Sequence, residues 1–158
     1  MKNWKKLLIS LALPQVAAAI AAYVTITGSG SWYEDLQKPE WNPPSWLFGP
    51  VWTLLYILMG IAFYLVWKGE GSSPQKRLAM TLWGVQLLLN FCWSIIFFKL
   101  QETGWATVEI ALLWLVLLAT IFAFARLSRL AAWLLVPYIS WVSFAAYLCY
   151  TIWQLNRT

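Results

Sequence analysis

Tryptophan is the residue type whose chemistry stands out in this sequence. The chain has 13 tryptophans among 158 residues and no histidine. Indole rings stack on other flat rings, with about 0.5–1.5 kcal/mol per pair beyond area burial. Histidine is the commonest metal ligand and the commonest general acid or base. We therefore expect no metal site and no cofactor such as haem, which would lack its usual histidine ligand. A flat, hydrophobic, metal-free ring fits these residue types better.

Aromatic and polar residues recur at helical spacing in three apolar stretches. Residues three, four or seven apart share a face of a helix. The three sets are Trp52 and Tyr56; Gln86, Asn90 and Trp93; and Trp141, Phe144, Ala145 and Leu148. Such faces could line one cavity, with Asn90 supplying an oriented hydrogen bond. Alternatively, Gln86 and Asn90 hold helices together and the tryptophans form an interfacial belt. The residues alone leave both interpretations open.

No catalytic set of a usual kind is present. The sequence has no phosphate-binding loop, no histidine-based triad and no pair of carboxylates within its apolar stretches. Glu109 lies about one turn into the fourth apolar stretch, where it could snorkel or reach an interface. Cys92 and Cys149 both lie in apolar stretches and are expected to fill space rather than to form a disulfide.

The composition is that of an integral membrane protein. Hydrophobic residues make up 61% of the chain and charged residues 11%, whereas soluble domains carry roughly 25% charged residues. The net charge of +5 does not indicate a nucleic-acid partner, because the basic residues flank the apolar stretches as orientation signals do. We expect an all-α membrane bundle forming a single domain over residues 1–158.

Five apolar stretches are long enough to cross about 30 Å of hydrocarbon as helices. They lie near residues 7–26, 50–67, 78–98, 105–125 and 130–154. The first is too long for an ordinary signal peptide and is expected to be retained. Short connections after the third and fourth stretches predict antiparallel neighbours. Pro137 is expected to kink the fifth helix.

The first connection, residues 27–49, is long and rich in proline. It holds Pro39, Pro43 and Pro44, and Pro50 follows it. Proline fixes φ and biases its predecessor toward extended geometry, which predicts a stiff connector over residues 37–46. Pro50 suits the first turn of a helix. A rigid aromatic connector that runs directly into a helix can cover a pocket.

Lysine and arginine predict the orientation. Eight of them would lie on the side that holds the N-terminus, and three on the other side, namely Lys38, Lys99 and Arg157. Loops on the inner side of a membrane carry the excess of basic residues. We expect the N-terminus inside and the proline-rich connector outside.

Three stretches carry the signature of a known family. WYEDLQKPEWNPPSWLFGPVWTLLYILMG, LLLNFCWSIIFF and LLVPYISWVSFAAYL resemble the first-loop, third-helix and fifth-helix motifs of the translocator protein family. Its members are also called tryptophan-rich sensory proteins or peripheral-type benzodiazepine receptors. The resemblance covers nearly the whole chain. It implies a five-helix membrane bundle, commonly dimeric, whose pocket beneath the first loop binds porphyrins, sterols and synthetic isoquinoline carboxamide or benzodiazepine ligands.

The family's pocket positions are matched unevenly. The matching residues are Trp52, Asn90, Trp93, Trp141 and Ala145. Animal members carry a sterol-recognition pattern of Leu, Tyr and a basic residue on the fifth helix. Here Leu148 and Tyr150 are present, but Gln154 takes the basic position, and Cys149 stands where asparagine is common. The pattern is weak even when complete. The resemblance therefore implies a porphyrin role of the microbial type more than a sterol role.

Three functions follow from the resemblance. The leading one is a membrane receptor or sensor for porphyrins, in a bacterial cell membrane and as a homodimer. The second is an enzyme for light- and oxygen-dependent degradation of protoporphyrin, with Trp52 and Trp141 as its catalytic residues. The third is a transporter of porphyrins or sterols. The expected ligand-binding residues are Tyr33, Trp46, Trp52, Tyr56, Asn90, Trp93, Trp141, Phe144, Ala145 and Leu148.

Overall fold

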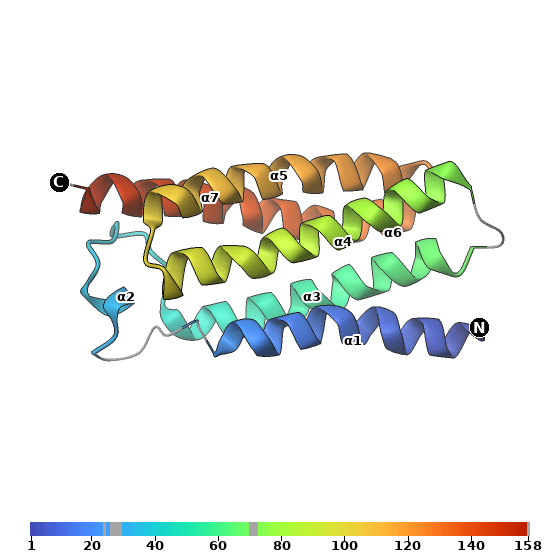
Figure 1. Ribbon diagram of the computed structural model, residues 1–158, viewed down its shortest axis with the longest axis horizontal. Helices are drawn as coiled ribbons and strands as arrows, with labels where there is room; N and C mark the ends of the chain where they lie inside the picture. Colours follow the sequence, from blue (N-terminus) through green and yellow to red (C-terminus); the bar gives the residue numbers. More distant parts are fainter. Residues whose placement is uncertain (24, 26–29, 70–72, 158) are drawn as a thin grey trace.

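Long helices lie side by side along the long axis of the molecule (Figure 1). The computed structural model describes residues 1–23, 25, 30–69 and 73–157. The long elements are α1 (Asn3–Ala22), α3 (Ser45–Trp67), α4 (Pro74–Ser94), α5 (Thr103–Ala125) and α7 (Val136–Asn156); the short ones are α2 (Trp32–Asp35), the π-helical turn η1 (Ile95–Lys99) and α6 (Arg129–Leu134). No strand occurs among these residues.

Five spans in the described part of the chain are long and apolar enough to cross a membrane, as predicted. They are α1, α3, α4 with η1, α5, and α6 with α7. Helix α1 packs mainly on α3, α4 on α5, and α5 on α7. The protein is thus an all-α, multi-pass membrane bundle.

Two proline predictions have different outcomes. Helix α3 begins at Ser45, so Pro50 lies inside it and the prediction of a first-turn position was wrong. The Pro43–Pro44 pair sets the boundary, because a residue before proline is disfavoured in helical geometry and Pro44 is itself extended. Near Pro137, where a kink was predicted, the helix is interrupted: α6 ends at Leu134 and α7 begins at Val136. Pro137 has no N–H to donate to the carbonyl four residues before it.

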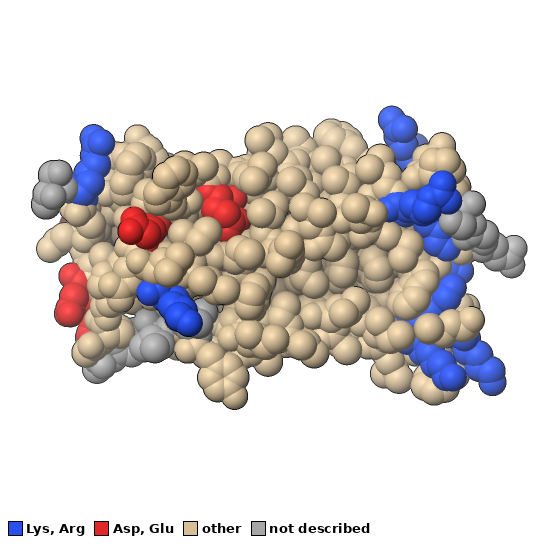
Figure 2. Space-filling model, viewed as in Figure 1, with Lys and Arg blue, Asp and Glu red and all other residues tan. Residues whose placement is uncertain are grey.

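Basic residues gather at one end of the bundle, as Figure 2 shows. This end holds the N-terminus, the α3–α4 connection and the α5–α6 connection (Figure 1). The first loop with α2 covers the opposite end, which holds the acidic residues Glu34, Asp35 and Glu40. The largely uncharged body between the two ends (Figure 2) is suited to hydrocarbon.

The half of the bundle toward the basic end is closely packed. Met59, Ala62 and Ala79 are fully buried there, and the rings of Phe63 and Trp83 stack with their centroids 4.1 Å apart. A Cβ placed on Gly60 of α3 would lie 2.6 Å from the Ser10 carbonyl oxygen of α1. The missing side chain of Gly60 therefore lets the two helices approach closely.

Candidate functional site

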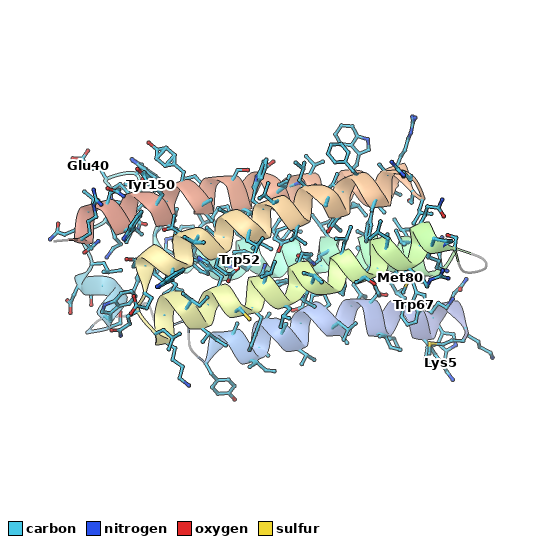
Figure 3. The ribbon with its side chains drawn as sticks, turned by 45° about the horizontal axis from the view of Figure 1, so that its top comes forward. Lys5, Glu40, Trp52, Trp67, Met80 and Tyr150 are labelled. Carbon is cyan, nitrogen blue, oxygen red and sulfur yellow. The ribbon has the colours of Figure 1, made fainter. Side chains whose placement is uncertain are left out.

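The half of the bundle beneath α2 encloses a cavity of about 390 Å³. Its walls come from α1, α3, α4, η1 and α7, with Tyr33 of the first loop above them. Trp52 lies between the helices toward this end, whereas Lys5 and Trp67 lie at the opposite end (Figure 3). A pocket of this size, mostly apolar with a few polar groups, is typical of sites for small hydrophobic ligands.

Nine of the ten predicted site residues line this cavity. They are Tyr33, Trp52, Tyr56, Asn90, Trp93, Trp141, Phe144, Ala145 and Leu148. Trp46 is the exception: its side chain is 72% exposed and it is not among the lining residues. It precedes Trp52 by six residues, which at about 100° per residue leaves the two side chains on different faces of α3.

Sequence reasoning missed part of the wall. Phe48 lies one turn before Trp52, and Cys149 and Ile152 each follow a predicted residue by four positions, so helical spacing could have found all three. Ala18 and Ala22 of α1 also line the cavity. Their small apolar side chains gave no signal that distinguishes a pocket wall from a contact between helices.

Aromatic rings from α3 and α7 meet in the cavity. The ring of Trp52 stacks on that of Tyr56, with 5.5 Å between the ring centroids, and meets that of Trp141 edge-on, with 6.4 Å between the centroids. The ring centroids of Phe48 and Phe144 lie 6.2 and 5.4 Å from that of Trp141. These rings offer both faces and edges to a flat ligand, the two geometries in which aromatic pairs interact best.

A chain of hydrogen bonds crosses the bundle at the cavity wall. The Tyr56 hydroxyl donates to Asn90 Oδ1 at 2.9 Å, and Asn90 Nδ2 donates to the Tyr138 hydroxyl at 2.7 Å. That hydroxyl in turn donates to Gln86 Oε1 at 2.8 Å, and Gln86 Nε2 donates to the Met59 sulfur at 3.4 Å. The chain joins α3, α4 and α7. Asn90 therefore holds helices together and also lines the cavity, so both interpretations of its sequence position apply.

Two indole N–H groups at the cavity are buried without an oxygen or nitrogen acceptor among the described residues, those of Trp93 and Trp141. The Cys149 thiol, a weak acceptor, interacts with the Trp93 N–H. Buried donors normally find partners. Both N–H groups lack accessible surface, so a ligand in the cavity gains them as donors only when side chains of the wall move.

The first loop is tied down by its own polar groups. Lys38 Nζ donates to the carbonyls of Tyr33, Glu34 and Leu36 at 2.8, 3.0 and 3.2 Å, and lies 4.7 Å from the centroid of the Tyr33 ring. Burial raises the pKa of the Tyr33 phenol, and its hydrogen bond with Asn42 only partly offsets this. The phenol is therefore neutral at physiological pH and can pack over the cavity.

A second tie joins the loop to the end of α7. The Gln37 N–H donates to Asn156 Oδ1 at 2.9 Å, and Asn156 Nδ2 donates to the Gln37 carbonyl at 2.8 Å. The Asn156 amide also donates to the Ile152 carbonyl of its own helix at 2.7 Å. The loop and α7 are thus connected across 119 positions of sequence.

Eight of the 13 tryptophans fall into the two roles that the sequence left open. Trp52, Trp93 and Trp141 line the cavity. Five others have at least 46% of their surface exposed, namely Trp4, Trp41, Trp46, Trp105 and Trp133. Exposed tryptophans near the ends of membrane helices are typical of interfacial belts.

Comparison with known proteins identifies the family. The sequence model of the TspO/MBR family matches residues 10–154. The chain belongs to the TspO/MBR family. It is 49% identical over 127 residues to the tryptophan-rich protein TspO of Chlorobaculum tepidum, covering 80% of each chain. It is 44% identical to the human translocator protein, covering 80% of this chain and 75% of the human one.

Another relative is similar to this chain over almost the whole length of both proteins. The tryptophan-rich protein TspO of Archaeoglobus fulgidus is 38% identical over 154 residues, which is 98% of this chain and 99% of the relative. The cavity-lining residues therefore fall within the part of the chain that the family comparison covers.

Proposed function

We propose that this protein is a membrane receptor or sensor that binds a porphyrin in the cavity beneath the first loop. The observation that carries the proposal is the meeting of Trp52, Trp93 and Trp141 around one mostly apolar cavity. A flat tetrapyrrole offers a large surface for stacking and carboxylates that accept hydrogen bonds. Synthetic isoquinoline carboxamide and benzodiazepine ligands, which combine aromatic rings with a carbonyl acceptor, suit the same cavity.

An enzymatic role is the second candidate. The rings of Trp52 and Trp141 meet at 6.4 Å on the cavity wall. A porphyrin beside them would lie within reach of two electron-rich indoles when it is excited by light, and oxygen would supply the oxidant for its degradation. Trp52 and Trp141 are the catalytic residues of this candidate function.

The deciding experiment mixes the purified protein with protoporphyrin in darkness, in light with oxygen, and in light without oxygen. A receptor gives saturable binding in darkness and no product beyond ordinary photobleaching. An enzyme gives a new absorbing product that needs both light and oxygen. The Trp52→Phe and Trp141→Phe variants should then bind porphyrin but lose turnover. Absence of saturable binding under every condition would contradict both candidates.

A transporter of porphyrins or sterols is the third candidate. Its distinguishing result is movement of porphyrin or sterol across the bilayer of sealed proteoliposomes. The basic position of the sterol pattern is Gln154 here, so tight sterol binding is not expected. If the incomplete pattern limits binding, Gln154→Arg should strengthen the binding of cholesterol.

We place the protein in a bacterial cell membrane, and the basic residues at the N-terminal end support an orientation with the N-terminus inside. In a cysteine-free background, a membrane-impermeant thiol reagent should label Glu40→Cys in intact cells but not Lys68→Cys; both positions are exposed. We also propose a homodimer, as the resemblance to the family implies; Ala21 on α1 is buried within the protomer and lines the cavity, so it does not mark the interface. Chemical crosslinking in membranes tests the dimer.

A further inference from the structure

Glu109 is an acidic side chain inside a membrane span. Among the described residues of the five spans, no other aspartate or glutamate occurs. Glu109 is the seventh residue of α5, so at about 1.5 Å per residue it lies about 9 Å along the helix. If the roughly 34 Å of α5 is centred on about 30 Å of hydrocarbon, the residue lies about 7 Å below the hydrocarbon edge.

The carboxyl group of Glu109 is buried, and no described residue offers it a hydrogen bond or a positive charge. Both of its oxygens are inaccessible, and neither accepts a hydrogen bond from any described residue. The titratable groups within its electrostatic range are Cys92 on α4 and Tyr138 and Cys149 on α7. None of the three carries a positive charge, so none can balance a carboxylate.

An ionised carboxylate in such a place would be expensive. Taking an unpaired charge out of water costs far more than binding a proton to it, so a buried acid without a partner becomes neutral. Ionisable residues at membrane depth are rare, and by default they are treated as functional sites. Glu109 does not itself line the cavity, but a charge on it would act on Cys149, which does.

We propose that Glu109 is a proton-binding site within the membrane, and that its proton keeps the adjoining cavity wall free of negative charge. The ligand-binding consequence rests on the proposed porphyrin function; the protonation itself does not. With the proton bound, the carboxylates of an anionic ligand meet a neutral wall near Cys149. Loss of the proton places a negative charge beside that wall, and anionic ligands bind more weakly.

The protonation is tested without any ligand. Infrared spectra of the reconstituted protein at pH 7 should contain the carbonyl stretch of a protonated carboxyl, and Glu109→Gln should remove it. The matched control is Glu102→Gln, which changes an exposed carboxyl just before α5. This control should leave the band in place. Absence of the band at pH 7 in the unaltered protein, or its loss in the control alone, would overturn the proposal.

A chemical probe gives a second readout. Dicyclohexylcarbodiimide partitions into lipid and adds to protonated carboxyls, whose O–H adds across a C=N bond of the reagent. Mass spectrometry should locate the adduct on Glu109 at pH 7, in the unaltered protein and in Glu102→Gln. Labelling confined to the loop carboxyls and to acidic pH would count against a protonated Glu109.

The coupling to the cavity is tested with two porphyrins of different charge. Affinity for protoporphyrin, a dicarboxylate, should fall about tenfold as pH rises and Glu109 loses its proton, the effect of one nearby charge at an effective dielectric constant near 20. Affinity for protoporphyrin dimethyl ester should not change, and Glu109→Gln should abolish the pH dependence. An equal pH dependence in Glu109→Gln would overturn the coupling. If neither porphyrin binds, the proposed function fails, and the infrared band still decides the protonation.

Discussion

The two halves of the bundle are built by the same five spans and are packed in opposite ways. Toward the basic end, α1 and α3 touch at Gly60, and Trp83 stacks on Phe63 while its N–H donates to the Met59 carbonyl at 3.2 Å. Beneath α2, the same helices leave a cavity of about 390 Å³, and the N–H groups of Trp93 and Trp141 have no oxygen or nitrogen acceptor among the described residues. The tryptophan N–H has a backbone acceptor in one half; in the other half the Trp141 N–H has no described partner and the Trp93 N–H has only the Cys149 thiol.

The difference shows how a membrane bundle can be stable although it contains a cavity. In lipid, helices associate through close packing and hydrogen bonds rather than through the exclusion of water. The closed half supplies the close packing. The hydrogen-bond chain from Tyr56 to Gln86 lies where the closed half meets the open one and joins three helices there. The open half therefore does not need close contact between its helices, and a cavity can remain there.

The largest expected effect comes from filling the closest approach in the closed half. Gly60→Ala would place a Cβ 2.6 Å from the backbone oxygen of Ser10, which no side-chain rotation can relieve. We expect a loss of about 3 kcal/mol in the free energy of unfolding, measured as a lower thermal midpoint in detergent. Gly49→Ala is the control on the same helix in the open half, because its new Cβ would meet no atom of another described element within 4 Å. Similar midpoints for both variants would contradict the comparison.

The next effect concerns the ligand and belongs to the open half. Trp52→Ala and Trp141→Ala should each weaken porphyrin binding by about 1–3 kcal/mol, because each removes a stacking platform. The corresponding phenylalanine variants should lose little affinity. The double alanine variant should show a non-additive loss, since both residues contact one ligand. Titration in darkness measures all of these.

The control for the ligand effect is Trp4→Ala. Trp4 is 56% exposed at the far end of α1 and belongs to the interfacial set. An equal loss of affinity in Trp4→Ala, with all variants equally folded, would mean that the tryptophans act only as a belt and that the ligand lies elsewhere.

A smaller effect is expected where the two halves meet. Tyr138→Phe removes the hydroxyl that accepts from Asn90 and donates to Gln86, and it leaves both amides short of a partner. Hydrogen bonds between membrane helices are worth about 0.6 kcal/mol on average and up to roughly 1.7, so we expect a loss of about 1–2 kcal/mol in unfolding free energy. Affinity for porphyrin should change less than in Trp52→Ala. A variant that unfolds normally but no longer binds porphyrin would make Tyr138 part of the ligand site.

Some features of the fold and of the candidate site could be predicted from the sequence, and others could not. The five spans followed from hydropathy and length, because the bilayer fixes both. Nine of the ten predicted site residues line the cavity, and they were identified by helical spacing together with the family resemblance. Trp46 was predicted to line the cavity because it is close to Trp52 in sequence. Its position on the turn of α3 leaves its side chain exposed instead. The start of α3 was predicted too late, because Pro50 is tolerated inside the helix. The hydrogen bonds between Gln37 and Asn156 could not be predicted, because the two residues are far apart in sequence and no local pattern marks the contact.

The smallest expected effect concerns the loop that closes the open half. Asn156→Ala removes both hydrogen bonds to Gln37 and leaves the ties made by Lys38 in place. The loop should then open more often, so we expect porphyrin to dissociate a few times faster while the association rate changes less, as is usual for variants of one binding site. Stopped-flow displacement in darkness measures both rates. Arg157→Ala is the matched control at the next position, because the Arg157 guanidinium lies over the Trp153 ring of its own helix. If both variants release porphyrin at the unaltered rate, ligand exchange does not pass beneath the loop, and the route lies between the helices, where α1 contributes only small side chains to the wall.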